Sequence, residues 1–197
     1  MKQARFRAPA RPGPDSLPSP FVVDLIAALG EQSVQWQPER LRAYEYDGSI
    51  DVGHPEAVAL ISRASDASTT LRIAAKNGRP VVPRGSGTGL SGGVVLTRGG
   101  VALTFSKMRG VTSVDPANLR ATVEPGVINL DVSRAVAAHG LYFAPDPSSQ
   151  AACSIGGNIA ENAGGAHCLA YGVTTNHVTG LACILRSEEH TSELQSH

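Results

Sequence analysis

The sequence predicts a fold that mixes helices and strands, as one domain or as a domain with a subdomain. Its 197 residues, 42% of them hydrophobic, are enough to bury one core. Short apolar segments alternate with helical patterns from residue 56 to residue 139. Two glycine-rich loops, residues 84–93 and 156–165, interrupt this alternation and point to a bound ligand.

The chain begins with a proline-rich segment. The prolines between residues 8 and 20 keep the backbone extended and deny it helical hydrogen bonds, so residues 1–20 are expected to form a tail. Phe21–Leu29, followed by Gly30, has the apolar face and the glycine stop of a short amphipathic helix. This helix is expected to open a helical extension, residues 21–53, and to pack on the domain that follows.

A strand, a helix and a second strand are predicted next. The apolar segment Glu56–Ile61 precedes a helical pattern at Ser65–Asn77, and Pro80–Pro83 is a short apolar strand. The helix is expected to bury one face. That face consists of Ala67, Leu71, Ala74 and Ala75. A strand, helix and strand in this order imply a right-handed crossover and two parallel strands.

Three further short strands and a second helix follow the first glycine-rich loop. The predicted strands are Val101–Phe105, Val111–Val114 and Arg120–Glu124, separated by glycine and proline. The helix is expected at about Leu130–His139, with Asn129 as its N-cap and Gly140 at its end.

The first loop contains Gly87–Gly92, which satisfies the dinucleotide pattern Gly-x-Gly-x-x-Gly. A Rossmann unit would start a helix at the last glycine, but here the chain continues into Val94–Leu96 and a further strand-like segment. What remains is a run of N–H groups, with hydroxyls from Ser86, Thr88 and Ser91, that can form an anion-binding concavity. Arg84 either adds charge at its mouth or is a solvated ion-pair partner.

The second loop belongs to a segment, Asp146–Gly165, that concentrates small residues. Glycines there let a ligand approach the main chain, and short polar side chains add hydrogen-bonding groups. A glycine-rich turn or bulge pair in an ordinary sheet is the alternative. Two such loops about sixty residues apart suggest a ligand held on two sides, as a dinucleotide would be.

These motifs resemble a known family. The chain resembles the FAD-linked oxidases of the vanillyl-alcohol-oxidase and p-cresol-methylhydroxylase superfamily. The motifs that carry the resemblance are Pro83–Gly93, Pro145–Ser149, Cys153–Asn158, Glu161–Gly165 and Tyr171–Gly172. The nearest branch acts on glycolate and the next on D-lactate. The likeness extends from about Tyr44 to about Leu185.

The resemblance implies an α+β fold, a two-subdomain FAD-binding domain of the p-cresol-methylhydroxylase type at residues 54–185, with FAD between the subdomains. The first subdomain would be about residues 54–110, and the second, about 111–185, would be truncated. Backbone N–H groups would hold the pyrophosphate at Arg84, Gly85, Ser86, Gly87, Thr88, Gly89 and Ser91. A second wall near the flavin and its ribityl chain would consist of Pro145, Ser148, Ser149, Ser154, Ile155, Gly156, Gly157, Asn158, Asn162, Gly164 and Gly165, closed by Tyr171 and Gly172. Since no histidine occurs between Arg84 and Gly93, the FAD is expected to be non-covalent.

The same resemblance implies oxidation of a small 2-hydroxy acid, glycolate or D-lactate, by hydride transfer to flavin, with an iron–sulfur subunit as partner. A non-catalytic FAD or nucleotide-binding module is the alternative. The 17 basic and 17 acidic residues cancel, which argues against nucleic-acid binding. No apolar run reaches the length of a membrane span, so the protein is expected in the cytoplasm, or peripheral to a membrane through its partner.

The cysteines and histidines are expected to have structural rather than catalytic roles in most cases. The three cysteines form no Cys-x-x-Cys pair, so neither a zinc site nor a disulfide framework is predicted, and no metal site is expected. Cys153 and Cys168 are expected to be small packing residues. His167 either touches flavin or substrate or has a structural hydrogen-bonding role, and His139 complements a helix dipole.

The last residues, 186–197, differ abruptly in composition from the residues before them, which are rich in alanine, glycine and valine. The peptide resembles the conceptual translation of a common sequencing adapter, and the alternative is a genuine polar helix or a disordered tail. With this segment excluded as an artefact, the chain is expected to be the front of a longer protein, cut inside its second subdomain. Catalytic residues and metal ligands would then lie downstream, and the fragment itself would bind FAD weakly or not at all and would be inactive.

Overall fold

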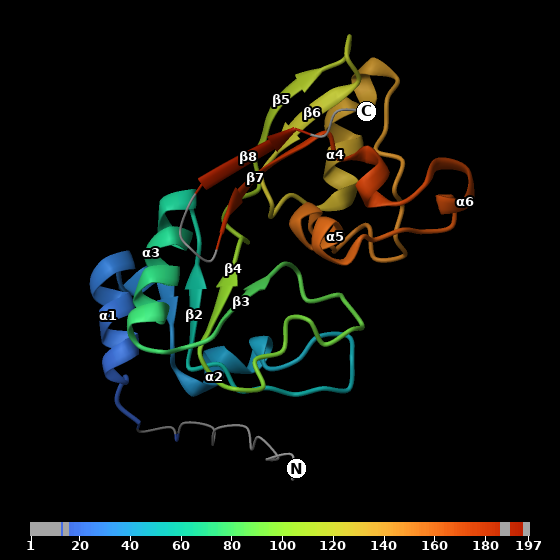
Figure 1. Cartoon of the computed structure of the whole chain (residues 1–197). Helices are drawn as coiled ribbons and strands as arrows, with labels where there is room; N and C mark the ends of the chain where they lie inside the picture. Colours follow the sequence, from blue (N-terminus) through green and yellow to red (C-terminus); the bar gives the residue numbers. More distant parts are fainter. Residues whose placement is uncertain (1–12, 14–15, 186–189, 195–197) are drawn as a thin grey trace, which may run out of the picture. The chain divides into compact units, whose positions relative to one another are not determined.

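The structure, a computed structural model, describes residue 13, residues 16–185 and the backbone of residues 190–194 (Figure 1). Most of the predicted proline-rich tail lies outside the described residues, as do residues 186–189 and 195–197 of the predicted artefact tail. The chain divides into two compact units, one up to Thr104 and the other from Phe105 onward.

The first unit begins with the predicted amphipathic helix, α1 (Pro20–Leu29). Ser19 caps it by accepting a hydrogen bond from the Val22 amide, and Gly30 ends it at a φ of 84°. Short elements follow. They are η1 (Glu31–Ser33), β1 (Val34–Gln35), α2 (Pro38–Leu41) and η2 (Arg42–Tyr44).

A four-stranded sheet forms the centre of the first unit. Its strands β2 (Ala57–Leu60), β3 (Val81–Arg84) and β4 (Val101–Thr104) join β1 in the order β1-β2-β4-β3. Both β2 and β3 run parallel to β4, which confirms the predicted parallel strands, but β4 lies between them. Every residue of β4 is buried, and such a strand belongs in the middle of a sheet.

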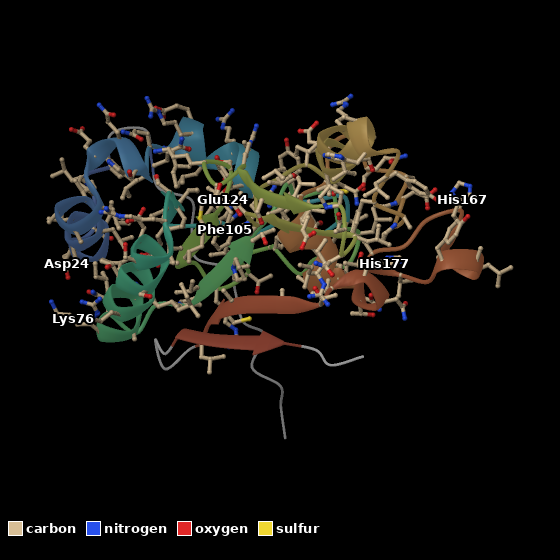
Figure 2. All side chains as sticks on the ribbon, turned by 90° about the horizontal axis from the view of Figure 1, so that it is seen from above. Asp24, Lys76, Phe105, Glu124, His167 and His177 are labelled. Carbon is tan, nitrogen blue, oxygen red and sulfur yellow. The ribbon has the colours of Figure 1, made fainter. Side chains whose placement is uncertain are left out.

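The crossover helix, α3 (Ala64–Lys76), lies beside α1 (Figure 1). The expected face is partly wrong, because Thr70 is buried with Ala67 and Ala74, whereas Ala75 is exposed. Thr70 is buried at little cost since its hydroxyl donates to the Asp66 carbonyl at 2.8 Å. At the other end of α3, the Lys76 ammonium lies 3.5 Å from the Asp24 carboxylate of α1 (Figure 2). The predicted packing of α1 on the domain is therefore confirmed.

The second unit starts with two strands at the predicted positions, β5 (Val111–Asp115) and β6 (Arg120–Val123), which pair as an antiparallel hairpin. The second predicted helix is also present as α4 (Asn129–Val136), continued by η3 (Ala137–His139). Gly140 ends it at a φ of 71°, as expected. The predicted cap is wrong: Ile128 is the N-cap residue, and the Asn129 side chain is buried.

The glycine-rich segment contains a helix rather than a pair of turns. Ser154 caps α5 (Ile155–Glu161), which ends at Asn162 in the left-handed conformation. The remaining elements are α6 (Cys168–Tyr171), η4 (Thr174–His177), β7 (Gly180–Ile184) and β8 (His190–Leu194). Strands β7 and β8 pair antiparallel, and whether the segment containing β8 is an artefact stays a prediction.

Each unit has its own apolar core. In the first unit, Leu41, Val58, Leu96 and Ala102 are packed together. In the second unit, the core consists of Val127, Val132 and Ile155, with Val111, Val123, Phe143 and Ile159 around it. Among the helices that the structure describes, none combines the length and apolar character that crossing a bilayer requires.

Candidate cofactor-binding site

The first candidate loop leaves the carboxyl end of β3, the edge strand of its sheet. Gly87 and Gly92 have φ values of 71° and 72°, a region that side-chain-bearing residues rarely occupy. Residues 93–100 form turns and irregular backbone, and the next regular element is β4. No Rossmann helix starts at Gly92. The structure therefore confirms the prediction that this loop is not a Rossmann loop.

The exposed part of this loop offers unpaired donors. Within the described residues, the backbone N–H groups of Ser86, Gly87, Thr88 and Gly89 donate to no other residue. Ser86 and Thr88 are exposed, and Gly87 and Gly89 are half-buried. Four successive donors near the surface are suited to an anion such as a pyrophosphate.

The surroundings of Gly89 indicate whether the loop leaves room for such a ligand. A Cβ at this residue would meet no heavy atom within 4 Å, and its φ is not in the left-handed region. Neither packing nor backbone conformation within the chain therefore requires glycine here. A ligand that approaches the main chain would require it, so the loop fits the pyrophosphate of a dinucleotide.

Arg84 has neither of the roles considered for its side chain. It is 6% exposed, and its Nη2 donates to the carbonyls of Tyr46 at 2.8 Å and Ala43 at 3.3 Å. Its guanidinium also lies 5.6 Å from the centre of the Tyr44 ring. Burial lowers its pKa, and the nearby Asp47 carboxylate partly offsets that effect. The side chain is a buried support of the loop rather than a solvated ion pair or a charge at its mouth.

The second candidate segment lies in the second unit, on the loop before α5, on α5 itself and on the turns after it. Pro145, Ser154, Ile155 and Asn158 are buried; Ser149, Gly156, Gly157, Gly164, Gly165 and Gly172 are half-buried; Ser148, Asn162 and Tyr171 are exposed. The structure thus brings these predicted residues together in one unit, around α5.

Several of the polar side chains in this segment already have partners within the unit. The Ser154 hydroxyl accepts from the Gly157 amide at 3.4 Å, and the Asn162 side chain accepts from the Thr175 amide at 3.1 Å. The buried Asn158 carboxamide donates to the Cys153 sulfur at 3.2 Å, which confirms Cys153 as a packing residue. Cys168, expected to pack as well, is exposed.

Asn129 is a central residue of this segment that the sequence did not indicate. Its side-chain amide donates to the Pro145 carbonyl at 3.2 Å and to Asn158 Oδ1 at 3.0 Å. The Asn129 backbone amide donates to the Cys153 carbonyl at 2.9 Å. One buried residue of α4 therefore connects the loop at Pro145 with α5. Its position at a helix start, the only signal in the sequence, suggested a cap instead.

The glycines of the second segment differ in what makes them necessary. A Cβ at Gly156 would lie 2.9 Å from Pro125 Cβ, and one at Gly164 would lie 2.8 Å from a Val173 methyl group. A Cβ at Gly165 would overlap the Asp146 carbonyl. These three glycines are required by packing inside the unit. Gly157 is different, because a Cβ there would meet only the Ser154 hydroxyl, at 3.3 Å.

An imidazole–carboxylate pair lies at the surface of this segment. His167 Nδ1 hydrogen-bonds the Asp146 carboxylate, which also accepts from the His167 amide at 3.3 Å. This pairing confirms a structural hydrogen-bonding role for His167, which Figure 2 labels. The hydrogen bond from His167 lowers the pKa of Asp146, against a smaller effect of burial. The Tyr171 ring lies 6.5 Å from both the His167 and Tyr142 rings.

Histidine, cysteine and acidic side chains do not assemble into a metal site. In the part of the chain that the structure describes, no group of three or more such residues is arranged to hold a metal ion.

Comparison with known proteins identifies the family. The family described as "FAD binding domain" matches residues 55–192. Glycolate oxidase subunit GlcD of Escherichia coli (strain K12) is 48% identical over 141 residues, which cover 71% of this chain and 28% of that protein. A D-lactate dehydrogenase of Archaeoglobus fulgidus is 38% identical over 148 residues, 73% of this chain and 33% of that protein. The chain thus spans about a third of the length of these relatives.

A solved structure supports the same assignment at the level of the fold. The structure of p-cresol methylhydroxylase with substrate bound matches with a TM-score of 0.74 and 18% identity, over 87% of this chain and 34% of that chain. The predicted α+β fold of the p-cresol-methylhydroxylase type is therefore confirmed for the part of the domain that the chain spans. With more than half of its residues matched, the chain belongs to the FAD-binding domain family, and its cofactor is FAD.

Proposed function

We propose that this chain is the FAD-binding part of an oxidoreductase that oxidises a small 2-hydroxy acid, glycolate or D-lactate. The observation that carries the proposal is the loop at Ser86–Gly89, with four unpaired N–H donors and a glycine that the fold itself does not need. The substrate class rests on the relatives, which are a glycolate oxidase subunit and a D-lactate dehydrogenase.

The first loop would bind the pyrophosphate of FAD through its main chain. Backbone N–H groups from Arg84 to Gly89 and at Ser91 are the proposed donors, and the exposed hydroxyls of Ser86 and Thr88 lie beside them. Since Arg84 is turned inward to the carbonyls of Ala43 and Tyr46, charge on the phosphates would be stabilised by dipoles rather than by a side-chain cation.

The second segment would contact the flavin end of the cofactor. Ser148, Ser149 and Tyr171 keep hydroxyls at or near the surface of the second unit, and Gly157 leaves the start of α5 uncovered by a side chain. The other proposed residues, Asn158 and Ser154 among them, would shape this surface from inside the unit. When bound, FAD supplies the acceptor for the substrate hydride, and the protein orients it. The binding is proposed to be non-covalent, because residues 84–93 contain no histidine.

The 197-residue chain is proposed to be inactive by itself. None of its described residues is assigned as a catalytic base here, and the relatives are about three times as long as the matched segment. The residues that bind and deprotonate the hydroxy acid are proposed to lie in the remainder of the full-length protein.

An electron-accepting partner with iron–sulfur clusters is proposed for the full-length protein. One relative is named as a subunit of glycolate oxidase, which supports a multi-subunit enzyme. Such a partner would also explain a peripheral association with a membrane. Co-purification of the full-length protein with a subunit that shows iron–sulfur absorbance would support this part of the proposal, and purification as a fully active single subunit would contradict it.

FAD binding can be tested directly on the purified chain. We expect the purified chain to bind added FAD weakly and to perturb its visible band, and we expect ADP to compete more strongly than riboflavin because only ADP carries the pyrophosphate. A visible band that stays unperturbed as the protein concentration is raised would contradict the proposal. Reduction of the bound flavin by glycolate or D-lactate would contradict the proposed inactivity of the chain. If the full-length protein binds FAD but is reduced by neither acid, a non-catalytic module is the better description.

A further inference from the structure

We propose that residues 43–53 form a clamp that holds the glycine-rich loop Arg84–Gly92 in its anion-binding shape, with Asp47 and Arg84 as positioning residues. This inference rests on the proposed binding of FAD by that loop. The clamp lies before the segment that matches the FAD-binding domain family, which begins at residue 55. The cofactor apparatus would therefore extend beyond the family domain.

The clamp is a small closed turn attached to the loop by main-chain contacts. Tyr46 and Val52 form an antiparallel bridge, which closes residues 46–52 into a turn. The Gly48 amide at its tip donates to the Gly89 carbonyl at 2.8 Å. Gly89 therefore has its carbonyl fixed by the clamp while its N–H group stays free of partners among the described residues.

Asp47 connects the clamp with the far end of the loop. Its Oδ1 accepts from the Ser49 amide at 2.8 Å, and the Gly92 backbone also hydrogen-bonds this carboxylate. Burial acts to raise the pKa of Asp47, but the hydrogen bonds from Ser49 and Gly92 outweigh it and lower the pKa overall. The carboxylate is thus ionised at neutral pH and accepts from both the clamp and the loop.

Arg84 connects the clamp with the start of the loop. Its Nη2 donates to the carbonyls of Ala43 and Tyr46, so the guanidinium lies between the last residue of β3 and the clamp. The charges of Arg84 and Asp47 attract each other.

The clamp and the loop approach each other too closely for side chains at the contact. A Cβ at Gly48 would lie 2.8 Å from both the Gly89 carbonyl oxygen and a Leu90 methyl group. One at Gly92 would lie 2.8 Å from Asp51 Oδ2, and one at Gly87 would overlap the Arg84 guanidinium. Glycine is therefore required at Gly48 by the close approach of the Gly89 main chain, and at Gly87 and Gly92 by their positive φ values.

The physical role of the clamp follows from the lack of regular structure in the loop. Residues 85–92 belong to no helix or strand, so no ladder of regular hydrogen bonds orients the four donor amides. Ordering a free loop on binding would cost part of the affinity, and a loop held in advance avoids that cost. Contacts at Arg84, Gly89 and Gly92 fix the start, middle and end of the loop, and they do not use the N–H groups of Ser86–Gly89.

The test compares Asp47→Ala with Asp47→Asn and with Asp115→Ala in the 197-residue chain. Asp115 is a matched control, because it is an exposed turn carboxylate that accepts from the Asn118 amide at 3.2 Å and has a lowered pKa, chiefly through its Asn118 hydrogen bonds. Two quantities are measured: hydrogen exchange of the Gly48 amide without FAD, because this amide donates to the loop at the Gly89 carbonyl, and the Kd for FAD by flavin fluorescence.

Asp47→Ala should speed exchange of the Gly48 amide about ten-fold and weaken FAD binding by a similar factor, the effect of losing one charge-assisted hydrogen bond. Asp47→Asn keeps an acceptor oxygen, so it should retain most of the slow amide exchange and most of the FAD affinity. Asp115→Ala should change neither the exchange rate nor the Kd. If Asp47→Ala does not fold, Ser49→Ala, which removes the hydroxyl that hydrogen-bonds Asp47, should give a smaller effect in the same direction.

Unchanged exchange of the Gly48 amide in Asp47→Ala, or faster exchange with an unchanged Kd, would overturn the clamp while FAD binding by the unsubstituted chain still stood. An equal loss in Asp115→Ala would overturn it as well. Failure of the unsubstituted chain to bind FAD would overturn the proposed function, and this inference with it.

Discussion

Replacing Asn129 with alanine should destabilise the second unit more than its single side-chain amide suggests. Asn129 is 1% exposed and donates to two acceptors, the Pro145 carbonyl and Asn158 Oδ1. Alanine removes both donors but leaves both acceptors inside, where water does not reach them. The change therefore leaves buried polar atoms unsatisfied rather than deleting a complete hydrogen-bonded pair.

The size of the effect follows from those two acceptors. A buried acceptor that loses its donor costs about 1–2 kcal/mol, so the two together cost about 2–4 kcal/mol. Asn158 keeps a contact with the Cys153 sulfur, at 3.6 Å from Oδ1, which places the expected value toward the lower end. At the level of a local opening, 2 kcal/mol corresponds to about 30-fold faster amide exchange.

Amide hydrogen exchange over α5, residues 155–161, measures this loss where it occurs. The single tryptophan is Trp36 in the first unit, so tryptophan fluorescence would report on the wrong part of the chain. Asn118→Ala is the control, because Asn118 is an exposed turn residue whose side chain pairs with Asp115, and it should cost about 0.5 kcal/mol or less. Equal effects of the two substitutions on α5 would refute the reasoning.

Three further changes separate packing, ligand contact and ionisation. Leu25→Ala, at a side chain that is 0% exposed, should lower the free energy of unfolding of the first unit by about 2–4 kcal/mol. Val23→Ala on the same helix, at a side chain that is 49% exposed, should lower it by less than about 1 kcal/mol. Urea unfolding followed by tryptophan fluorescence measures both effects. Gly89→Ala should leave stability unchanged but weaken FAD binding, since the added Cβ meets no atom of the protein; an unchanged Kd would count against ligand contact at this loop. The His167 hydrogen bond lowers the pKa of Asp146 in the folded protein. The stabilisation from this bond is therefore complete above about pH 4, the pKa of an unfolded aspartate, and is lost as the pH falls through the lower pKa of the folded state. NMR titration of the Asp146 carboxyl group should show the lowered pKa, and His167→Ala should return it toward its ordinary value.

The elements with clear periodicity could be predicted from the sequence, but the order of the strands could not. The β2, α3 and β3 segments carry their pattern within a few residues, and the structure has them where the pattern indicated. Sheet order depends on which strand is most buried. β4 is apolar over three of four residues and comes last in sequence, yet it takes the central position, because only there are both faces covered.

Asn129 shows why part of the site could not be predicted. An asparagine at the start of a helix is most simply explained as a cap, since capping needs only neighbours in sequence. Its partners are instead Pro145, 16 residues away, and Asn158, 29 residues away. The same holds for Asp47, whose bond to Gly92 joins segments that no local pattern connects. Long-range polar contacts of this kind appear only when the chain is folded.

The glycines show that a correct ligand assignment can rest on residues with different roles. Gly156, Gly164 and Gly165 were predicted to expose backbone to a cofactor, yet each is required by a neighbour inside the unit. Gly89 has no such neighbour, so contact with a ligand is the physical reason left for it. The density of glycines alone therefore does not separate a packing requirement from a ligand contact. The two segments thus differ physically, because the second is close-packed within its unit and the first leaves a run of backbone donors open.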